Sequence, residues 1–392
     1  MEKEYKIGVD VSRVYRGDRG IPISTRNILQ QFGKFATNAE FTLLHYPENK
    51  PNTDFGLDNP EFREIPYSGK YVPWLRPYQE QVLYPEFQKK LGINVLWHPQ
   101  NHGQYETPVG YVVTLHDIFP MVRPELAEAL DVAEVDKKFL SDSRIKSIIG
   151  ADAVITVSKF SKQEIVANVD VDPDKVHIVH HGIDTSVFYP GYVDLEVVKK
   201  YNLPKKYLLT VGSYAPHKNL KSLILGYQNS CLPDSGVDLV MVGPKDGTVY
   251  KTNIDEIDKL KESSPLKNRI HMLPSIPLQE LASIYRGADT FAITSIYEGF
   301  GFPPLEAMAS GVPVVVSNTS SLPEVCGEAA LYVNPLNPCE ITQQLNRLCD
   351  DDTLRRDMIS KGLINVKNFT WENSAQQTYK ILTDVSDKRK GL

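Results

Sequence analysis

The sequence predicts an α/β protein made of two doubly wound, Rossmann-like domains. Its 392 residues are about twice the length of a common domain. In both halves, short apolar runs alternate with longer segments of helical pattern, and this order of elements produces parallel sheets covered by helices on both faces. Two such series indicate two sheets, and we expect the two domains to face one another across a cleft. Ligands of doubly wound sheets bind beyond the carboxyl ends of the strands.

The expected elements follow the chain in two series. In the first half the strands are expected at residues 6–11, 40–45, 95–98, 110–115, 153–157 and 176–179, and the helices at 24–35, 80–91, 136–149 and 159–168. In the second half the strands are expected at residues 207–211, 237–242, 270–273, 290–294, 313–317 and 330–333, and the helices at 220–229, 279–287, 304–310 and 339–350.

The boundary between the domains is expected near residues 188–204, where Tyr189-Pro190-Gly191 and Asn202-Leu203-Pro204 interrupt the pattern. We therefore predict an N-terminal domain over 1–190 and a C-terminal domain over 191–370. The remaining residues, 371–392, should form a helix from Trp371 to about Leu382 that packs back on the first domain, and the charged tail Asp387–Leu392 should be frayed.

Composition and charge narrow the class of protein. The net charge of −6 argues against a nucleic-acid binder, because phosphate binding usually shows as a basic surplus. The four cysteines contain no CxxC pair, so neither a disulfide framework nor a zinc site is expected, and a reducing compartment fits. The first residues carry no apolar signal segment, and no run approaches the roughly 20 apolar residues of a spanning helix. We expect a cytoplasmic protein that touches a membrane at most peripherally.

Residues 295–311 carry the clearest chemical signal. An expected strand leads into a loop with Gly299 and Gly301, and a helix follows at Pro303-Pro304. The first amides of a helix lack intrahelical partners and its dipole favours an anion, so this pattern predicts a phosphate site. Glu298 in the loop and Glu306 in the first helical turn flank it. Carboxylates accept from the vicinal hydroxyls of a ribose or a sugar, although Glu298 alone could equally be a solvated turn residue.

Lys218 marks a second segment of the expected anion site. It follows the strand at 207–211 and precedes the helix at 220–229, where a cation opposes the helix dipole unless an anion compensates. That mismatch favours a phosphate role for Lys218. The alternative is a surface lysine in water.

The glutamate spacing brings in a known family. Glu298 to Glu306 matches the E-x7-E signature of retaining GT-B glycosyltransferases, and the surrounding stretch resembles glycosyltransferase family 4. Further segments typical of that family are Tyr285-Arg286-Gly287-Ala288-Asp289, Ser317-Asn318-Thr319-Ser320-Ser321-Leu322-Pro323-Glu324-Val325 and Phe369-Thr370-Trp371-Glu372. The resemblance covers nearly the whole chain and is closest to bacterial mannosyltransferases of surface polysaccharides.

The resemblance implies a role for each motif. Glu298 would contact the donor sugar, Glu306 the donor ribose and Lys218 the diphosphate. His116, at the end of the strand at 110–115, would reach the donor sugar, although a lone histidine is more often structural. The implied catalytic residues are therefore Glu298, Lys218 and His116. The implied donor-binding residues are Gly20, Ser213, His217, Ser275, Ile276, Gly299, Phe300, Gly301, Phe302, Leu305 and Glu306.

Acceptor contacts are expected in the first domain. The candidates are Asp117, Arg16 and Trp74, of which Trp74 lies in an aromatic, proline-rich stretch that could stack on a sugar, touch lipid headgroups or pack between domains. Ser213 and His217 stand where many relatives carry arginine, so the positive charge is thin. His217, Lys245 and Arg286 are candidates to compensate for it.

No metal or other cofactor is expected. Asp170-Val171-Asp172 could be taken for the metal-binding DxD of another glycosyltransferase class, but no buried strand precedes it and we interpret it as a loop. Asp350-Asp351-Asp352 is interpreted as a solvated helix end.

The resemblance implies a retaining hexosyltransferase that moves a sugar from a nucleotide donor to a glycan or lipid-linked glycan, with no nucleic-acid partner. GDP-mannose is the first candidate donor, and UDP-glucose, UDP-N-acetylhexosamines and dTDP-rhamnose remain open. The alternatives are a GT-B epimerase, a phosphorylase and a catalytically inactive sugar-nucleotide-binding protein. A dinucleotide dehydrogenase is disfavoured because no G-x-G-x-x-G opens a first helix.

Overall fold

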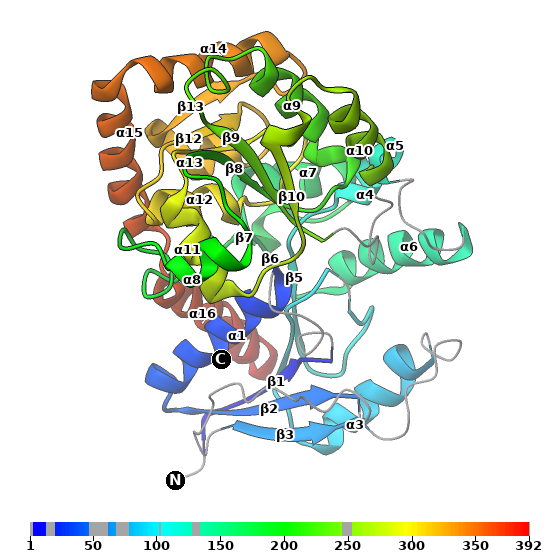
Figure 1. Cartoon of the computed structure of the whole chain (residues 1–392). Coiled ribbons are helices and arrows are strands. Elements are labelled where there is room, and N and C mark those ends of the chain that lie inside the picture. Colours follow the sequence, from blue (N-terminus) through cyan, green and yellow to red (C-terminus); the bar gives the residue numbers. More distant parts are fainter. Residues whose placement is uncertain are drawn as a thin grey trace. The chain divides into compact units, whose positions relative to one another are not determined.

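The computed structural model describes residues 3–12, 20–46, 62–67, 78–101, 103–127, 134–244 and 253–391, with backbone alone for 126, 127 and 134–141. The chain divides into two compact units (Figure 1). Unit 1 comprises Met1–Val122, Ala133–Gly182 and Trp371–Leu392, and unit 2 comprises Arg123–Val132 and Ile183–Thr370. The division between Gly182 and Ile183 precedes the expected one at residue 190, and Ile183 already donates its backbone N–H to Phe369 O of unit 2, at 2.9 Å.

Unit 1 is built on a seven-stranded parallel sheet in the order β3-β2-β1-β4-β5-β6-β7. The strands are β1 (Tyr5–Asp10), β2 (Ala39–His45), β3 (Phe62–Pro66), β4 (Val95–His98), β5 (Gly110–Leu115), β6 (Ala153–Thr156) and β7 (Val176–Ile178). The strand order reverses direction between β1 and β4, which is the point where doubly wound sheets bind ligands. The edge strand β3 was not predicted, because its polar Arg63 and Glu64 break the apolar run on which strand prediction depends.

Helices cover both faces of this sheet. They are α1 (Ile21–Phe35), the π-helical turn η4 (Gln79–Leu83) that continues into α3 (Tyr84–Lys90), α4 (Phe119–Val122), α6 (Glu134–Gly150), α7 (Lys159–Asn168) and α16 (Trp371–Lys390). On one face, Phe32 of α1 stacks on Phe41 with ring centroids 5.2 Å apart. On the other, Leu96 and Tyr111 belong to a core that includes Ile148 of α6 and Ile165 of α7.

The last helix belongs to unit 1. α16 packs against α1, β4 and β5, and Leu382 within it is fully buried. The helix extends past its expected end near Leu382, and the expectation of a frayed tail from Asp387 on was wrong, since the helix continues to Lys390. Arg389 in this stretch donates to both carboxylate oxygens of Asp152, at 3.0 to 3.1 Å.

Unit 2 is built on a six-stranded parallel sheet in the order β10-β9-β8-β11-β12-β13. The strands are β8 (Tyr207–Val211), β9 (Asp238–Val242), β10 (Ile270–Leu273), β11 (Thr290–Ile293), β12 (Val314–Ser317) and β13 (Ala330–Val333). Here the order reverses between β8 and β11. The helices are α8 (Leu195–Lys200), α9 (Leu220–Gln228), α10 (Ile254–Ser263), α11 (Leu278–Gly287), α12 (Phe302–Ala309), α13 (Leu322–Cys326), α14 (Pro338–Asp350) and α15 (Asp352–Asn365). A further short helix, α5 (Pro124–Ala127), also clusters with unit 2.

The helices α8, α10, α13 and α15 were not among the expected elements. The junction before α15 shows why. Asp351 is the single residue between α14 and α15, and its carboxylate accepts from the backbone N–H groups of Thr353 and Leu354 at 2.9 Å. This is an N-cap that satisfies two helical donors. The acidic stretch interpreted as a solvated helix end therefore joins two helices.

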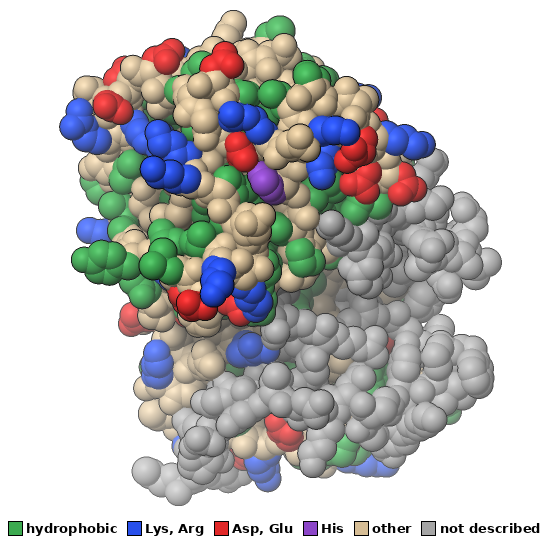
Figure 2. Space-filling view, viewed as in Figure 1, with side chains coloured by type: hydrophobic (Ala, Val, Ile, Leu, Met, Phe, Trp, Pro, Cys, Tyr) green, Lys and Arg blue, Asp and Glu red, His purple; other side chains and the backbone are tan. Residues whose placement is uncertain are grey.

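The described surface carries charges of both signs. On the face shown in Figure 2, lysine and arginine side chains lie among aspartate and glutamate side chains, and neither sign gathers into an extended stripe. None of the described helices combines the length and the apolar character needed to cross a bilayer.

Candidate functional site

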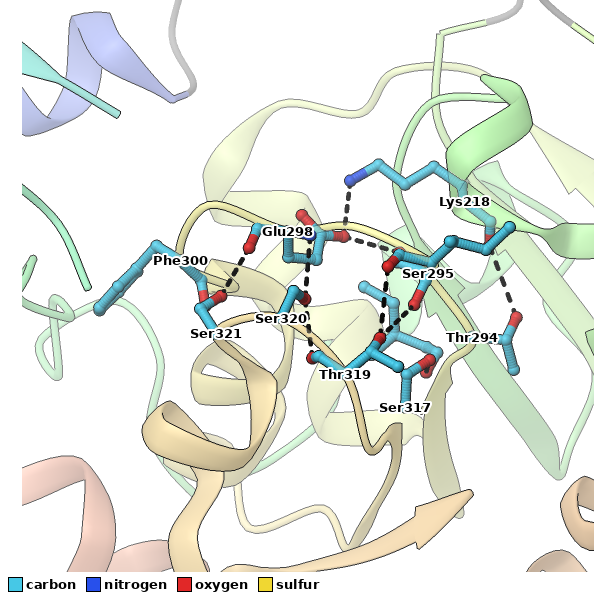
Figure 3. Close-up of polar contacts among 11 residues, drawn as sticks. Lys218, Thr294, Ser295, Glu298, Phe300, Ser317, Thr319, Ser320 and Ser321 are labelled. Atoms are coloured by element: carbon cyan, nitrogen blue, oxygen red, sulfur yellow. Dashed lines mark hydrogen bonds and ion pairs between the residues drawn. The ribbon is translucent and has the colours of Figure 1, made fainter. Parts of the chain in front are cut away.

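The candidate site of unit 2 lies where the strand order reverses. β8 and β11 are paired neighbours, so the loops that follow them leave the same edge of the sheet side by side. The first loop ends in the 3-10 turn Pro216–Lys218, and the second contains Glu298. Lys218 and Glu298 point toward one another, and the ammonium Nζ lies 2.7 Å from Glu298 Oε1 (Figure 3). Their side chains are only 18% and 12% exposed, so this ion pair is largely withdrawn from solvent.

Three serines fix the position of Glu298. Ser295 Oγ donates to the same Oε1 at 2.7 Å. The backbone N–H of Glu298 donates to Ser320 Oγ at 3.1 Å, and Ser321 Oγ donates to the Glu298 carbonyl at 2.9 Å (Figure 3). Ser320 and Ser321 follow β12, so a third loop holds the backbone of Glu298 in place.

The protonation state of Glu298 follows from these contacts. Burial by itself would raise the pKa of Glu298, but the charge and hydrogen bond of Lys218, together with His217 and Ser295, outweigh it and hold the pKa below its ordinary value. Glu298 is therefore a carboxylate at neutral pH, able to accept hydrogen bonds from hydroxyl groups.

The glycine loop leads into α12 through Gly301. This residue has a φ of +108°, and a Cβ there would approach Leu322 Cδ2 to 2.8 Å, so both the backbone conformation and the space require glycine. α12 begins at Phe302, two residues before the expected start at residue 304, and Pro303 and Pro304 occupy its next two positions. Proline has no N–H, so these two residues keep the helix dipole but donate nothing to an anion. Backbone donors must come from the loop up to Phe302.

Glu306 is held by a residue that sequence reasoning did not assign to the site. Because α12 begins at Phe302, Glu306 lies in its second turn and not in the first as expected. Tyr285 of α11 donates its hydroxyl to Glu306 Oε2 at 2.7 Å. The tyrosine ring is fully buried and contacts Phe291 and Phe188. The tyrosine lies in a motif quoted for the family, but its contact with Glu306 has no signal in the sequence because two different helices contribute it.

Among the described candidates of this site, Lys218 is the residue that brings a positive charge to Glu298. His217 beside it is buried, and that burial, followed by the charge of Lys218, lowers its pKa to about 3 against the opposing effect of Glu298. His217 is therefore neutral near pH 7 and cannot compensate for a missing arginine. Arg286 forms hydrogen bonds away from this pair, since its guanidinium donates to the backbone oxygens of Tyr192 and Val187. Lys245 lies outside the described residues.

The other expected donor residues lie on neighbouring loops. Ser213 follows β8. At its neighbour Gly212, a Cβ would lie 3.7 Å from Cδ and Cε of the Lys218 side chain. Ser275 and Ile276 follow β10, where the serine is exposed and the isoleucine is buried. Phe300 contacts Phe302 with ring centroids 5.3 Å apart, and Leu305 is fully buried.

His116 of unit 1 has partners on both ring nitrogens. Its Nδ1 lies 3.1 Å from His181 Nε2, and its Nε2 lies 3.2 Å from the carbonyl oxygen of Pro99. Since a carbonyl only accepts, His116 Nε2 carries the proton, and His181 Nε2 then donates to His116 Nδ1. Burial lowers the pKa of both rings, so the pair is neutral. In this arrangement the ring of His116 must exchange a protein partner for a ligand before it can contact a sugar.

Two further expected residues of unit 1, Asp117 and Gly20, lie on loops that follow β5 and β1. Asp117 accepts from the backbone N–H of Phe119 at 3.2 Å. Gly20 is the residue before α1 and has a φ of +64°. Arg16 and Trp74 lie outside the described residues.

A polar pocket at the strand reversal of unit 1 was not anticipated. Its lining includes Asp10 from the end of β1, His98 from the end of β4, and the nearby Gln100 and Gln104. Asp10 accepts from Tyr67 Oη at 2.9 Å and from Ser12 Oγ at 2.5 Å. Gln104 is 1% exposed, yet neither polar atom of its side chain bonds to a described residue. A buried amide in that condition favours a polar occupant of the pocket, water or ligand.

His217 makes a pH dependence testable. Between pH 3 and pH 6.5, the His217 ring binds a proton in the unfolded chain but not in the folded one, because its folded pKa is about 3 and its ordinary pKa is 6.5. The contribution of the neutral His217 to stability is therefore fully present above pH 6.5 and is lost as the pH falls toward 3. At pH 5 this difference in proton binding lowers the free energy of unfolding by about 2 kcal/mol relative to pH 7. Urea unfolding of His217→Gln should show a shallower decline over this range than the unsubstituted protein, and parallel curves would contradict the buried neutral histidine.

Sequence comparisons agree with this architecture. Residues 194–363 match the family model of glycosyl transferases group 1, and residues 36–187 match that of Glycosyltransferase Family 4. O-antigen chain mannosyltransferase B of Escherichia coli is 33% identical over 277 residues, which cover 69% of this chain and 70% of that protein. O-antigen chain mannosyltransferase RfbU of Salmonella typhimurium is 32% identical over 223 residues, 57% of this chain and 56% of that protein.

Solved structures show the same fold at low identity. Sucrose-phosphate synthase from Thermosynechococcus elongatus superposes with a TM-score of 0.75 at 19% identity, covering 97% of this chain and 99% of that one. Anabaena HepE, solved in complex with UDP and glucose, gives a TM-score of 0.71 at 15% identity, covering 97% of this chain and 100% of that one. Both sheets, both strand reversals and the family matches lead to one assignment: the chain belongs to the group 1 glycosyltransferases of family 4, with the GT-B fold, and is a hexosyltransferase.

Proposed function

We propose that this protein transfers mannose from GDP-mannose, with retention of configuration, to a growing glycan or lipid-linked glycan of a surface polysaccharide. The similarity to O-antigen mannosyltransferases supports the sugar and the acceptor class. The observation that carries the proposal is the enclosed Lys218–Glu298 pair beside the glycine loop. It sets a cation and a hydroxyl-binding carboxylate next to one another, as a sugar diphosphate requires. We expect the reaction at the cytoplasmic face of a membrane.

The proposed chemistry assigns each contact a task. Lys218 stabilises the diphosphate as the bond from its oxygen to the sugar C1 breaks, and Glu298 holds the sugar hydroxyls. The acceptor oxygen bonds to C1 from the same face, and its proton passes to the departing phosphate oxygen. Glu306 binds the ribose. His116, released from one of its present partners, contacts the sugar. No resident metal takes part in this scheme.

The donor assignment can be tested by thermal unfolding and by transfer. GDP should raise the melting temperature more than UDP, ADP or dTDP, and a nucleotide at a hundred times its dissociation constant stabilises by about 2.7 kcal/mol. Lys218→Met and Glu298→Gln should each lower kcat for transfer from GDP-mannose by roughly 100-fold or more. The first removes the cation that faces the charge developing on the diphosphate, and the second removes the carboxylate that holds the sugar hydroxyls in position.

Lys221→Met is the matched control. Lys221 lies one turn further along the chain, is 58% exposed and pairs with Glu256 at the surface. Its substitution should leave transfer unchanged. Full activity in both site variants would overturn the proposed site, and a clear preference for another nucleotide would overturn GDP-mannose alone.

Tyr285 tests the ribose role of Glu306. Tyr285→Phe keeps the buried ring and removes the hydroxyl that holds the carboxylate, a hydrogen bond to a charged group worth about 1.5 to 3 kcal/mol. We expect weaker binding of GDP, by roughly tenfold, and little change for 2′,3′-dideoxy-GDP, which offers no hydroxyls to Glu306. Equal losses for both nucleotides would indicate a packing defect in place of a ribose contact.

A further inference from the structure

Two cysteines far apart in the sequence meet in unit 2. Cys231 follows the end of α9, while Cys349 and Asp350 are the last two residues of α14. One possible ligand atom from each of the three residues lies within 4.8 Å of the other two. Both cysteines are free and partly buried, and Asp350 is exposed. The cluster therefore combines a fixed interior side with an open approach from solvent.

The packing of α9 on α14 fixes this arrangement. A Cβ at Gly226 would lie 2.5 Å from Ile341 Cγ2, so the two helices approach as closely as glycine permits. Thr342 Oγ1 donates to the carbonyl of Gly226 at 3.0 Å. One turn further on, Asn346 Oδ1 accepts from the backbone N–H of Cys231 at 2.8 Å. These contacts hold the Cys231 backbone against the last turns of α14, where Cys349 lies.

We propose that Cys231, Cys349 and Asp350 bind a thiophilic divalent cation, Zn²⁺ by its ligand chemistry, with water in the fourth position. Thiolate sulfur and carboxylate oxygen are ligands that zinc takes in tetrahedral sites. Binding would release the two thiol protons to solvent as two zinc–sulfur bonds form. The carboxyl-terminal end of α14 carries the negative end of the helix dipole, which favours a cation there. Ser235 Oγ, 3.4 Å from Cys349 Sγ, is placed to hydrogen-bond that sulfur.

The consequence of such a site would be mechanical. The ion would tie the end of α9 to the end of α14, and α9 begins two residues after Lys218. It would therefore stabilise the helix that follows the lysine loop without entering the transfer reaction. The inference is independent of the proposed donor and acceptor. Sequence spacing gives no sign of it, because no CxxC pair is present and the ligands come from the segment after α9 and from the end of α14.

Cobalt provides the test, because thiolate–Co²⁺ bonds absorb in the near ultraviolet. The full-length protein, made metal-free and kept reduced by a phosphine that carries no thiol, is titrated with Co²⁺. We expect a charge-transfer band that saturates at one equivalent and disappears when Zn²⁺ is added. Cys231→Ser and Cys349→Ser should each lose at least half of the band, and the double variant should lose all of it. Asp350→Asn should require more Co²⁺ to saturate.

Cys339→Ser is the matched control, because Cys339 is an exposed cysteine near the start of the same helix α14. It should keep the whole band. Equal melting temperatures without metal will show that the variants fold, and one equivalent of Zn²⁺ should raise the melting temperature of the unsubstituted protein but not of the double variant. The absence of a band, or a band that persists in the double variant, would overturn the site.

Discussion

The pairing of β8 with β11 is the constraint on which the site of unit 2 depends. The chain builds β8, β9 and β10 outward in one direction and returns to the other side of β8 with β11. Helices that follow adjacent strands on opposite sides of such a reversal leave a space between their loops. Lys218 and Glu298 enter that space from the two loops and form their ion pair there. The contacts of Ser295, Ser320 and Ser321 hold the second of these loops in place.

The ion pair itself is a compromise between attraction and desolvation. Withdrawing both charges from water is costly, and a pair held by its own attraction alone often contributes little net stability. Here Ser295 donates a further hydrogen bond to the carboxylate, and the neutral His217 adds no competing charge. The two prolines of α12 remove backbone donors from the same space, so backbone N–H groups that bind an anion there must come from the loop up to Phe302, beside Lys218.

Sequence patterns predicted the buried parallel strands best, because a strand that is apolar on both faces reads as a continuous run. The bounds of β4, β5, β8, β10 and β13 agree residue for residue with the prediction. β3 was missed as a polar edge strand, and α15 because its cap looked like the end of α14. The glutamate pair of the site was found from a local motif. Tyr285 was not assigned to that site, because its contact with Glu306 joins two different helices. In unit 1, His181 and Gln104 were not singled out, because no sequence motif marks them.

The return of the chain from unit 2 to unit 1 has a consequence for synthesis. Nearly all of unit 2 is one continuous segment, Ile183–Thr370, whereas unit 1 lacks α16 until residues Trp371–Leu392 have been made. Until then, the apolar surfaces of α1, β4 and β5 that α16 covers stay open. Domains generally fold as units while the ribosome is still translating, the earlier one first. In this protein, unit 1 is the first to be started but cannot be completed until unit 2 has been translated. The sheet face that α16 covers is therefore open to aggregation throughout the translation of unit 2.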